Sequence, residues 1–421
     1  MKYSIARAGA RQQLLGSFGP AELSLRCSRS TTRSLLSHAA APTLTFTLAQ
    51  RRRFASSPPS DPPPPPKVIF SGIQPTGVPH LGNYLGALKQ WKRMQDEAEP
   101  GTTLLFSIVD LHAITMPRRQ GTLAQGKREM LAALLAVGLD PQRSIIFYQS
   151  TVPAHSELQW ILSCTASMGY LSRMTQWKDK MSMSTTASLQ DDGAKTRLKH
   201  GLFSYPILQA ADILVHRATH VPVGDDQRQH LEFARECVTN FNHAYGGAHL
   251  VVPETMVSPA KRVMSLRDPS KKMSKSDPDP LSTITLSDPP SQVSKKIMTA
   301  LTDSTPTVSY DPVTRPGVSN LLELWSHFDP DQRTPAQLAS DFITNADSSV
   351  VVRRNHLGAL KAGVVEAVEA EMGGIRERYF EFLMPEKAGY LDEIIEEGGR
   401  KARESAEETM KIVREAVGLG A

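Results

Sequence analysis

Cysteine is scarce in this chain, which has three among its 421 residues. The two that lie beyond the N-terminal region, Cys164 and Cys237, form no CxxC pair. A disulfide framework or a structural zinc site needs several cysteines at short spacing. The sequence therefore argues against both.

Long apolar runs are also absent. No stretch approaches the roughly 18 consecutive apolar residues of a transmembrane helix, so we expect no segment that spans a membrane. Apolar residues nevertheless make up 40% of the chain. At this length they suffice for a sizeable core and predict about two domains.

Acidic residues are rare in residues 1–66, where nine Lys or Arg stand against Glu22 and Asp61. That stretch carries a charge of +7, and because the whole chain carries +5, the remainder carries −2. Residues 1–54 are rich in Arg, Ser, Ala and Leu, the composition of a mitochondrial or plastid transit peptide, and we interpret them as a mitochondrial targeting presequence. Residues 55–66 predict a stiff Pro-rich linker. We expect the mature protein in the mitochondrial matrix; the alternative is a disordered basic arm that binds RNA.

The chain from residue 67 onward alternates short β-branched runs with longer runs of helical periodicity. The runs "KVIFS", "TLLFSIVD" and "SIIFYQS" predict buried strands, and the segments between or after them predict helices. This βαβαβ order is typical of a doubly wound parallel sheet. Further along, "HVPVGDDQRQHLEFARECV" predicts a strand, a Gly turn and a helix with Asp225 near its N-cap.

The last part of the sequence has a different pattern. Strand patterns fade beyond residue 280, and most of the chain after it has helical periodicity. Ser405 and Glu408 predict a capping box at the start of a last helix, and Gly418 predicts its end. We therefore predict an α/β fold with a Rossmann-like domain at 67–290, a helical domain at 291–385 and C-terminal helices at 386–421.

Two loops carry the candidate chemistry. The loop after the first strand, "SGIQPTGVPHLGNYLGA", has glycines that let the backbone approach a ligand and precedes a helix N-terminus, which suits a phosphate. It is neither GxGxxG nor a P-loop, and its glycines could instead only shape a tight turn. The second loop, "DPSKKMSKSDPDP", places Lys271, Lys272 and Lys275 close together, which predicts an anion between them.

Together the two loops resemble a known pair of motifs. Residues His80 to Asn83 resemble the HIGH motif, and Lys272 to Ser276 match the KMSKS motif, of class I aminoacyl-tRNA synthetases. The whole of residues 67–421 resembles the tryptophanyl-tRNA synthetases of bacteria and organelles. Asn83 replaces the second His of the general motif, and Gln209 stands where many bacterial relatives have Met. The further motifs are "FSGIQPTG", "GNYLGAL", "IVDLHAIT", "LAVGLDP", "VPAHSEL", "RMTQWKDK", "AADIL" and "VPVGDDQRQH".

The resemblance implies a two-step reaction with ATP, L-tryptophan and tRNA(Trp) as partners, in a homodimer whose helical domain reads the anticodon. It implies that Mg²⁺ is held mainly by ATP, so we expect no protein metal site. His80, Lys180, Lys272 and Lys275 would be the catalytic residues, the lysines stabilising charge on pyrophosphate. The implied ATP-binding residues are Gln74, Pro75, Thr76, Gly82, Asn83, Gly224, Asp225, Asp226, Val263, Lys272, Met273, Ser274, Lys275 and Ser276.

The resemblance also implies a tryptophan pocket in which Asp212 accepts the indole N–H. A carboxylate in so apolar a helix is costly to bury without a donor, and a structural role would need a partner that the sequence does not identify. The implied tryptophan-binding residues are Asp212, Phe70, Gln74, Tyr205, Gln176, Gln227, Val221 and Val223.

Less specific interpretations remain open from the residues alone. His112 could be a core histidine with satisfied hydrogen bonds, and Lys180 an ordinary solvated lysine. At the level of the whole protein, a tyrosyl-tRNA synthetase shares this fold and mechanism. A catalytically idle RNA-binding paralogue is the alternative from a different class, although intact Lys272, Lys275 and Asp226 argue against it.

Overall fold

The computed structural model describes residues 66–420 except 118, 182, 185, 187, 225–226, 258–262, 276 and 345–355. The presequence at 1–54 and nearly all of the linker at 55–66 lie outside the described residues, so their predicted roles stay predictions. Within the described part no helix is both long enough and apolar enough to cross a membrane.

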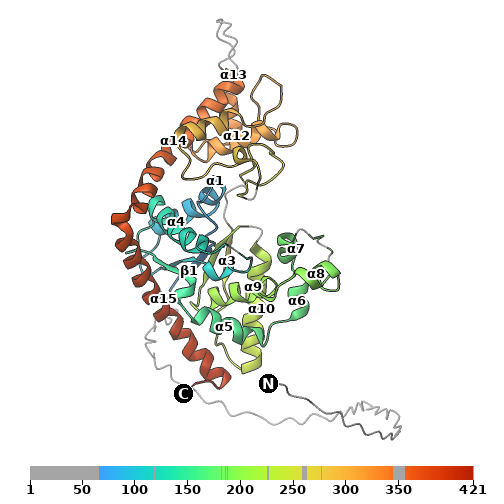
Figure 1. Cartoon of the computed structure of the whole chain (residues 1–421), viewed down its shortest axis with the longest axis vertical. Coiled ribbons are helices and arrows are strands. Elements are labelled where there is room, and N and C mark those ends of the chain that lie inside the picture. The colour runs from blue at the N-terminus through green and yellow to red at the C-terminus, as the bar shows by residue number, and fades with distance from the viewer. Residues whose placement is uncertain are drawn as a thin grey trace, which may run out of the picture. The chain divides into compact units, whose positions relative to one another are not determined.

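A five-stranded, fully parallel sheet forms the centre of the N-terminal half, in the order β3-β2-β1-β4-β5 (Figure 1). This confirms the predicted doubly wound parallel sheet. The chain order reverses between β1 and β4, and ligands of such sheets bind at that switch point, beyond the carboxyl ends of the strands. The strands are β1 (Val68–Ile73), β2 (Thr103–Ile108), β3 (Ile145–Tyr148), β4 (His220–Val223) and β5 (Glu254–Val257).

Helices lie on both faces of the sheet and connect its strands (Figure 1). The mostly buried α4 is typical: it ends at Gly138, whose φ of 105° is open to glycine and strained for other residues. The elements of this part are α1 (Leu81–Asn83), η1 (Tyr84–Leu88), α2 (Lys89–Asp96), α3 (Asp110–Ala113), α4 (Thr122–Val137), η2 (Gln149–Thr151), α5 (Ala154–Ser163), α6 (Met168–Arg173), α7 (Gln176–Lys180), α8 (Asp192–Arg197), α9 (His200–Leu214) and α10 (Arg228–Tyr245).

The described chain from residue 290 onward is mostly helical, as predicted, while residues 263–289 are mostly loop. In that region α14 packs on α4, and α15 packs on β3, so the last helices lie against the sheet part (Figure 1). These elements are η4 (Pro280–Ser282), α11 (Pro290–Met298), α12 (Pro316–Ser326), α13 (Pro335–Thr344), α14 (His356–Leu383), η5 (Pro385–Lys387) and α15 (Ala388–Val417).

One prediction about the last helix was wrong. Ser405 and Glu408 do not cap a helix start, because α15 begins at Ala388 and runs through both residues. The Ser-x-x-Glu pattern also occurs inside helices, where the backbone N–H groups already have partners. The predicted end is confirmed: Gly418 is the C-cap, with a left-handed φ of 78°.

Two apolar clusters form the core. In the first, Trp91 of α2 stacks on Phe106 of β2 with ring centroids 4.6 Å apart, and both side chains are at most 2% exposed. The second gathers Phe147, Trp177 and other residues with the apolar face of α15. Truncating a fully buried aromatic side chain to Ala costs about 3–5 kcal/mol, so these contacts fix how the elements around the site are placed.

Candidate active site

A cavity of about 620 Å³ opens beyond the carboxyl ends of β1 and β4. Its walls include the loop after β1, η1, α7, α9 and the loop after β4, which lie far apart in the sequence. The structure thus brings many of the predicted site residues together at the switch point of the sheet. Those that line the cavity are Phe70, Gln74, Gly82, Asn83, Gln176, Lys180, Tyr205, Asp212, Val221, Val223, Gly224, Gln227, Val263 and Lys272.

Other predicted residues are not among those that line the cavity. Met273 is 2% exposed and packs in the apolar core, where a methionine side chain is ordinarily found. Asp225, Asp226 and Ser276 lie outside the described residues. The remaining predicted residues that do not line the cavity are Pro75, Thr76, His80, Ser274 and Lys275.

His80 begins the helix that follows the first loop. Its Nδ1 accepts the backbone N–H of Asn83, and its own N–H donates to the Asn83 side chain, both at 3.2 Å. Since Nδ1 is an acceptor, the neutral ring carries its proton on Nε2. Burial, and then Lys275 and Lys272, lower the pKa of His80 to about 4. At neutral pH the ring is therefore an uncharged donor.

The lysine loop lies against the loop after β1. Lys275 Nζ donates to the carbonyl of Gly77 at 2.8 Å. Lys272 lines the cavity and pairs as an antiparallel bridge with Met264, while Met273 N–H donates to the carbonyl of Val263 at 2.9 Å. Lys272 and Lys275 also help to lower the pKa of His80, so this end of the site is cationic.

Lys180 lies at the end of α7 and lines the same cavity. Its ammonium group is 4.5 Å from the centroid of the Tyr205 ring, a cation–π distance. Burial lowers its pKa from the ordinary value. The residue as a whole is nevertheless exposed, so Lys180 lines the cavity while keeping contact with water.

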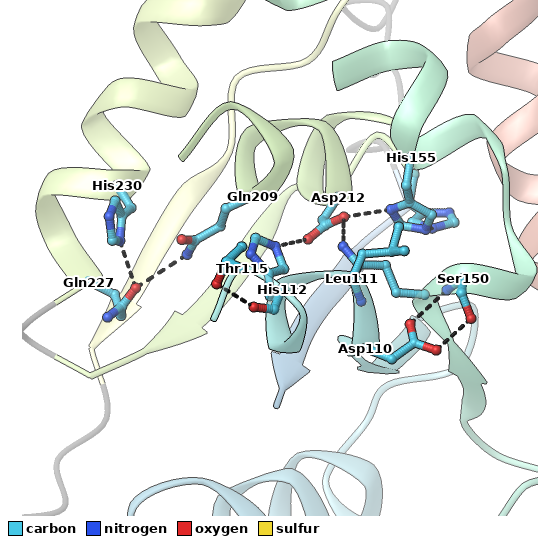
Figure 2. Close-up of polar contacts among 12 residues, drawn as sticks. Asp110, Leu111, His112, Thr115, Ser150, His155, Gln209, Asp212, Gln227 and His230 are labelled. Carbon is cyan, nitrogen blue, oxygen red and sulfur yellow. Dashed lines mark hydrogen bonds and ion pairs between the residues drawn. The ribbon is translucent and has the colours of Figure 1, made fainter. Parts of the chain in front are cut away.

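Asp212 is 1% exposed and lies at the other end of the cavity, on α9. Figure 2 shows it between two histidines: Nε2 of His112 is 2.8 Å from Oδ2, and Nδ1 of His155 is 2.7 Å from Oδ1. Gln149 Nε2 donates to Oδ1 at 2.7 Å. Burial alone would raise the pKa of Asp212, but the hydrogen bonds from His112 and His155 outweigh it and hold the pKa at about 2.

The carboxylate is thus ionised, and the described residues leave one of its positions open to a donor. An ionised carboxylate offers about four lone-pair positions, and three are taken here, two on Oδ1 and one on Oδ2. His112 is buried and hydrogen-bonded, as the core interpretation expects, and it also lines the cavity. These partners of Asp212 come from α3, η2 and α5. Sequence reasoning considered only His112 among them, and did not pair it with Asp212.

A second hydrogen-bond network joins residues of the cavity wall. The Gln227 side-chain oxygen lies 2.7 Å from Nδ1 of His230 and accepts from Gln209 Nε2 at 3.4 Å (Figure 2). His230 Nε2 in turn lies 3.2 Å from the Tyr205 hydroxyl. Gln209, the residue that differs from many bacterial relatives, therefore joins a network of residues that line the cavity. Sequence reasoning did not single out His230, although its helix was predicted.

One buried hydrogen-bond acceptor in the cavity wall has no donor among the described residues. Gln176 Oε1 has no hydrogen bond to any described residue, while its Nε2 donates to Gln229 at 3.2 Å. A buried oxygen without a donor is costly in a native protein unless a ligand supplies one. Gln176 lines the cavity, so a ligand with an N–H or ammonium group suits this position.

The arrangement can bind a polyphosphate at one end and a flat apolar group with one N–H at the other. Basic side chains and glycines surround the first end, and Phe70, Val221 and Val223 line the second with Asp212. The described residues include no cluster of three or more His, Cys, Asp or Glu placed to hold a metal ion. Additional cavity-lining residues that were not predicted include Gly72, Gly86, Gln90, Asp179 and His230.

Comparison with known proteins places the chain in a family. The model of the family described as "tRNA synthetases class I (W and Y)" matches residues 65–372. A mitochondrial tryptophan–tRNA ligase of Saccharomyces cerevisiae is 43% identical over 83% of this chain and 90% of its own length.

Solved structures agree. A tryptophanyl-tRNA synthetase from Mycoplasma pneumoniae matches with a TM-score of 0.69 at 31% identity, over 84% of this chain and 98% of that one. One from Campylobacter jejuni, solved with ADP and tryptophan, matches with a TM-score of 0.66 at 32% identity, over 84% and 100%. The chain belongs to the class I aminoacyl-tRNA synthetases, in their tryptophan–tRNA ligase family.

Proposed function

We propose that this protein activates L-tryptophan with ATP and transfers it to tRNA(Trp). The single observation that carries the proposal is one cavity with a cationic end and an apolar end that holds a buried, ionised carboxylate. Such a site can bring a nucleoside triphosphate and an amino acid with an N–H on its ring into contact. Neither a tyrosyl enzyme nor an idle paralogue finds support in the relatives named above.

In the first step the tryptophan carboxylate attacks the α-phosphorus of ATP. A bond forms between a carboxylate oxygen and phosphorus, and the bond from phosphorus to the bridging oxygen breaks, which gives tryptophanyl-adenylate and pyrophosphate. The tRNA's terminal ribose hydroxyl then attacks the acyl carbon, and AMP leaves. The protein's task is to position the reactants and to stabilise charge, so no nucleophilic side chain is needed.

The basic residues would act where that charge develops. Lys272 and Lys180 line the cavity, and Lys275 lies on the same loop as Lys272. Positive charge near the departing pyrophosphate stabilises the transition state more than the ground state, because negative charge grows there. Neutral His80 would donate from Nε2 to a phosphate oxygen, which needs no proton transfer.

Mg²⁺ would be held by the phosphates of ATP. The described residues at the cationic end are lysines, glycines and amides, and Mg²⁺ prefers phosphate oxygens and water to such a set. When bound, the ion would neutralise part of the triphosphate charge.

The indole would lie between Phe70, Val221 and Val223, with its N–H toward the open lone-pair position of Asp212. The α-ammonium would donate to Gln176 Oε1, the buried acceptor that has no partner among the described residues. Phenylalanine has no ring N–H and would leave the charge of Asp212 partly unmatched, so the site would reject it by a factor of about 10⁴ to 10⁵.

The helical domain at 291–385 would read the anticodon loop of tRNA(Trp), where unpaired bases are open to side chains. Deleting residues 291–355 should reduce tRNA charging far more than adenylate formation. Equal loss of both activities would contradict this division of labour.

We further propose that the protein is a homodimer in the mitochondrial matrix. Trp160 on α5 and Met168 at the start of α6 are 70% and 63% exposed, so a dimer interface over these helices would bury two large apolar side chains. Trp160→Glu should yield monomers in light scattering; a monomeric wild type would contradict the proposal.

A fusion of residues 1–66 to a reporter should enter mitochondria, and a cytosolic reporter would contradict the localisation.

Charging of transcribed tRNA(Trp) with radiolabelled amino acids tests the overall function. The wild type should attach tryptophan to the tRNA, and the charged tRNA should then be lost only by slow hydrolysis. Tyrosine should give no charged tRNA above background. Charging of tRNA(Tyr) with tyrosine instead would identify the tyrosyl enzyme, and binding of tRNA without any charging would identify an idle paralogue.

A further inference from the structure

A chain of buried polar side chains runs from Asp212 to the last helix. His155 Nδ1 lies 2.7 Å from Asp212 Oδ1, and the Nε2 atoms of His155 and His216 are 3.3 Å apart. Nδ1 of His216 lies 3.2 Å from Oγ of Ser405 on α15. His155 and His216 are 0% and 2% exposed. We call Asp212, His155, His216 and Ser405 the Asp212 relay.

The hydrogen bonds of the relay begin at an acceptor-only end. The ionised carboxylate of Asp212 can only accept, so His155 donates from Nδ1. Nε2 of His155 and Nε2 of His216 share the next hydrogen bond, whose donor is set by the tautomers of the two rings. Burial, and then the proximity of His155, lower the pKa of His216 well below its ordinary value. Nδ1 of His216 and the hydroxyl of Ser405 form the last hydrogen bond of the relay.

His216 also contacts the apolar wall of the cavity. Its ring stacks on Phe70 with centroids 5.8 Å apart and an interplanar angle of 19°, and it meets Phe147 edge-on at 5.6 Å. Phe70 itself lines the cavity. One imidazole thus supports both the carboxylate, through His155, and an aromatic side chain of the cavity wall.

We propose that His155 and His216 are positioning residues for the recognition of tryptophan and that Ser405 anchors them to α15. The proposal rests on the proposed function, in which Asp212 accepts the indole N–H. Donors on both oxygens fix the plane of the carboxylate, and the open position on Oδ2 keeps its direction only while His155 keeps its tautomer and orientation. Without His216, Nε2 of His155 would be buried without its hydrogen-bond partner, and the ring could reorient.

Two substitutions break the relay without removing its packing. His216→Phe keeps an aromatic ring against Phe70 and Phe147 but can neither donate nor accept. Ser405→Ala removes only the hydroxyl, whereas Ser405→Thr keeps one. His243→Phe, on an exposed part of α10, is the matched control for replacing a histidine by an aromatic residue.

The experiment is steady-state ATP–pyrophosphate exchange with the full chain and varied tryptophan, phenylalanine or ATP. The KM for tryptophan should rise about tenfold in His216→Phe and about threefold in Ser405→Ala, the range expected for one disturbed buried hydrogen bond. The kcat and the KM for ATP should stay within about twofold of the wild type, because the lost interaction concerns tryptophan binding alone. Ser405→Thr should restore the tryptophan KM, and discrimination against phenylalanine should fall in His216→Phe.

Unchanged tryptophan KM values in both His216→Phe and Ser405→Ala would overturn the proposal. The proposal would also be overturned if kcat and every KM worsened together in step with a lower Tm. It would likewise be overturned if the tryptophan KM of Ser405→Thr were as high as that of Ser405→Ala. If His216→Phe fails to fold, the comparison of Ser405→Ala with Ser405→Thr tests the proposal. A wild type that does not activate tryptophan would refute the proposed function itself; a loss of discrimination in Asp212→Asn but not in the relay variants would refute the relay alone.

Discussion

The side chain of Asn320 on α12 bonds both backbone groups of Met264. Its Oδ1 accepts the Met264 N–H and its Nδ2 donates to the Met264 carbonyl, each at 3.2 Å. Met264 in turn pairs with Lys272. A buried residue of the helical region therefore holds the segment on which the lysine loop rests.

Asn320→Ala should weaken ATP binding and leave tryptophan binding unchanged. The two backbone groups of Met264 would lose their partners, which costs about 1–3 kcal/mol, and the lysine loop would lose its support. We expect the KM for ATP to rise about tenfold in pyrophosphate exchange. Asn320→Asp keeps the acceptor but not the donor and should give an intermediate value. A wild-type KM for ATP in both variants would show that the contact does not support the loop.

Lys275→Ala should slow adenylate formation by roughly a hundredfold, because its charge acts mainly on the developing pyrophosphate. The dissociation constant for tryptophan, measured by fluorescence quenching, should change little. Lys271→Ala is the matched control: Lys271 lies on the same loop but is mostly exposed and pairs with Asp268 at 2.9 Å. The assignment fails if Lys271→Ala slows the step as much as Lys275→Ala does.

Asp212→Asn should fold and bind ATP but lose discrimination for tryptophan. The amide group would present N–H atoms to His112 or His155, which already donate, and the open acceptor position would be disturbed. We expect a loss on the order of 2–4 kcal/mol in the ratio of kcat/KM for tryptophan over phenylalanine. Normal selectivity in a variant that is merely less stable would make Asp212 a structural residue.

The same carboxylate predicts a pH dependence of stability. Its pKa in the folded protein, about 2, lies below the ordinary 3.8, so it contributes stability that is fully present above about pH 4 and is lost as pH falls toward 2. Urea unfolding of the wild type and Asp212→Asn should therefore give a difference that shrinks with acidification in that window. The range from pH 5 to pH 2 covers the folded and the unfolded pKa. A difference in unfolding free energy between the two proteins that stays constant over this range would contradict the lowered pKa of Asp212.

His80 predicts a second pH dependence of stability, in a different pH range. Its pKa in the folded protein, about 4, lies below the ordinary 6.5, so the folded state binds fewer protons in between and loses stability as pH falls from 6.5 to 4. His80→Asn keeps an N-cap acceptor and removes the titrating ring, so it should lose less stability than the wild type over this range. An imidazole NMR titration with a midpoint near 6.5 would show that the ring is not held neutral.

The fold and the cationic end of the site could be predicted because their signals are local. The strand before the first loop, the glycines of that loop and the lysines at 271–275 each stand in one short stretch. The fifth strand was missed, since β5 has four residues and follows Pro253 directly, a residue typical of loops.

The surroundings of Asp212 could not be predicted for a different reason. His112 and His155 lie 100 and 57 residues from it in the chain, and Ser405 lies 189 residues from His216. Only the packing of α3, α5 and α15 around α9 brings them together. No local pattern of a single sequence records such contacts.

The most direct test of the central claim is ATP–pyrophosphate exchange by the full chain with each of the twenty amino acids. The account predicts rapid exchange with tryptophan and, for phenylalanine, a rate lower by a factor of about 10⁴ or more, because phenylalanine has no ring donor for the open position on Asp212. Tyrosine, whose hydroxyl is a donor on a ring of different shape, should also exchange more slowly than tryptophan. Exchange that is fastest with tyrosine, or no exchange with any amino acid, would contradict it.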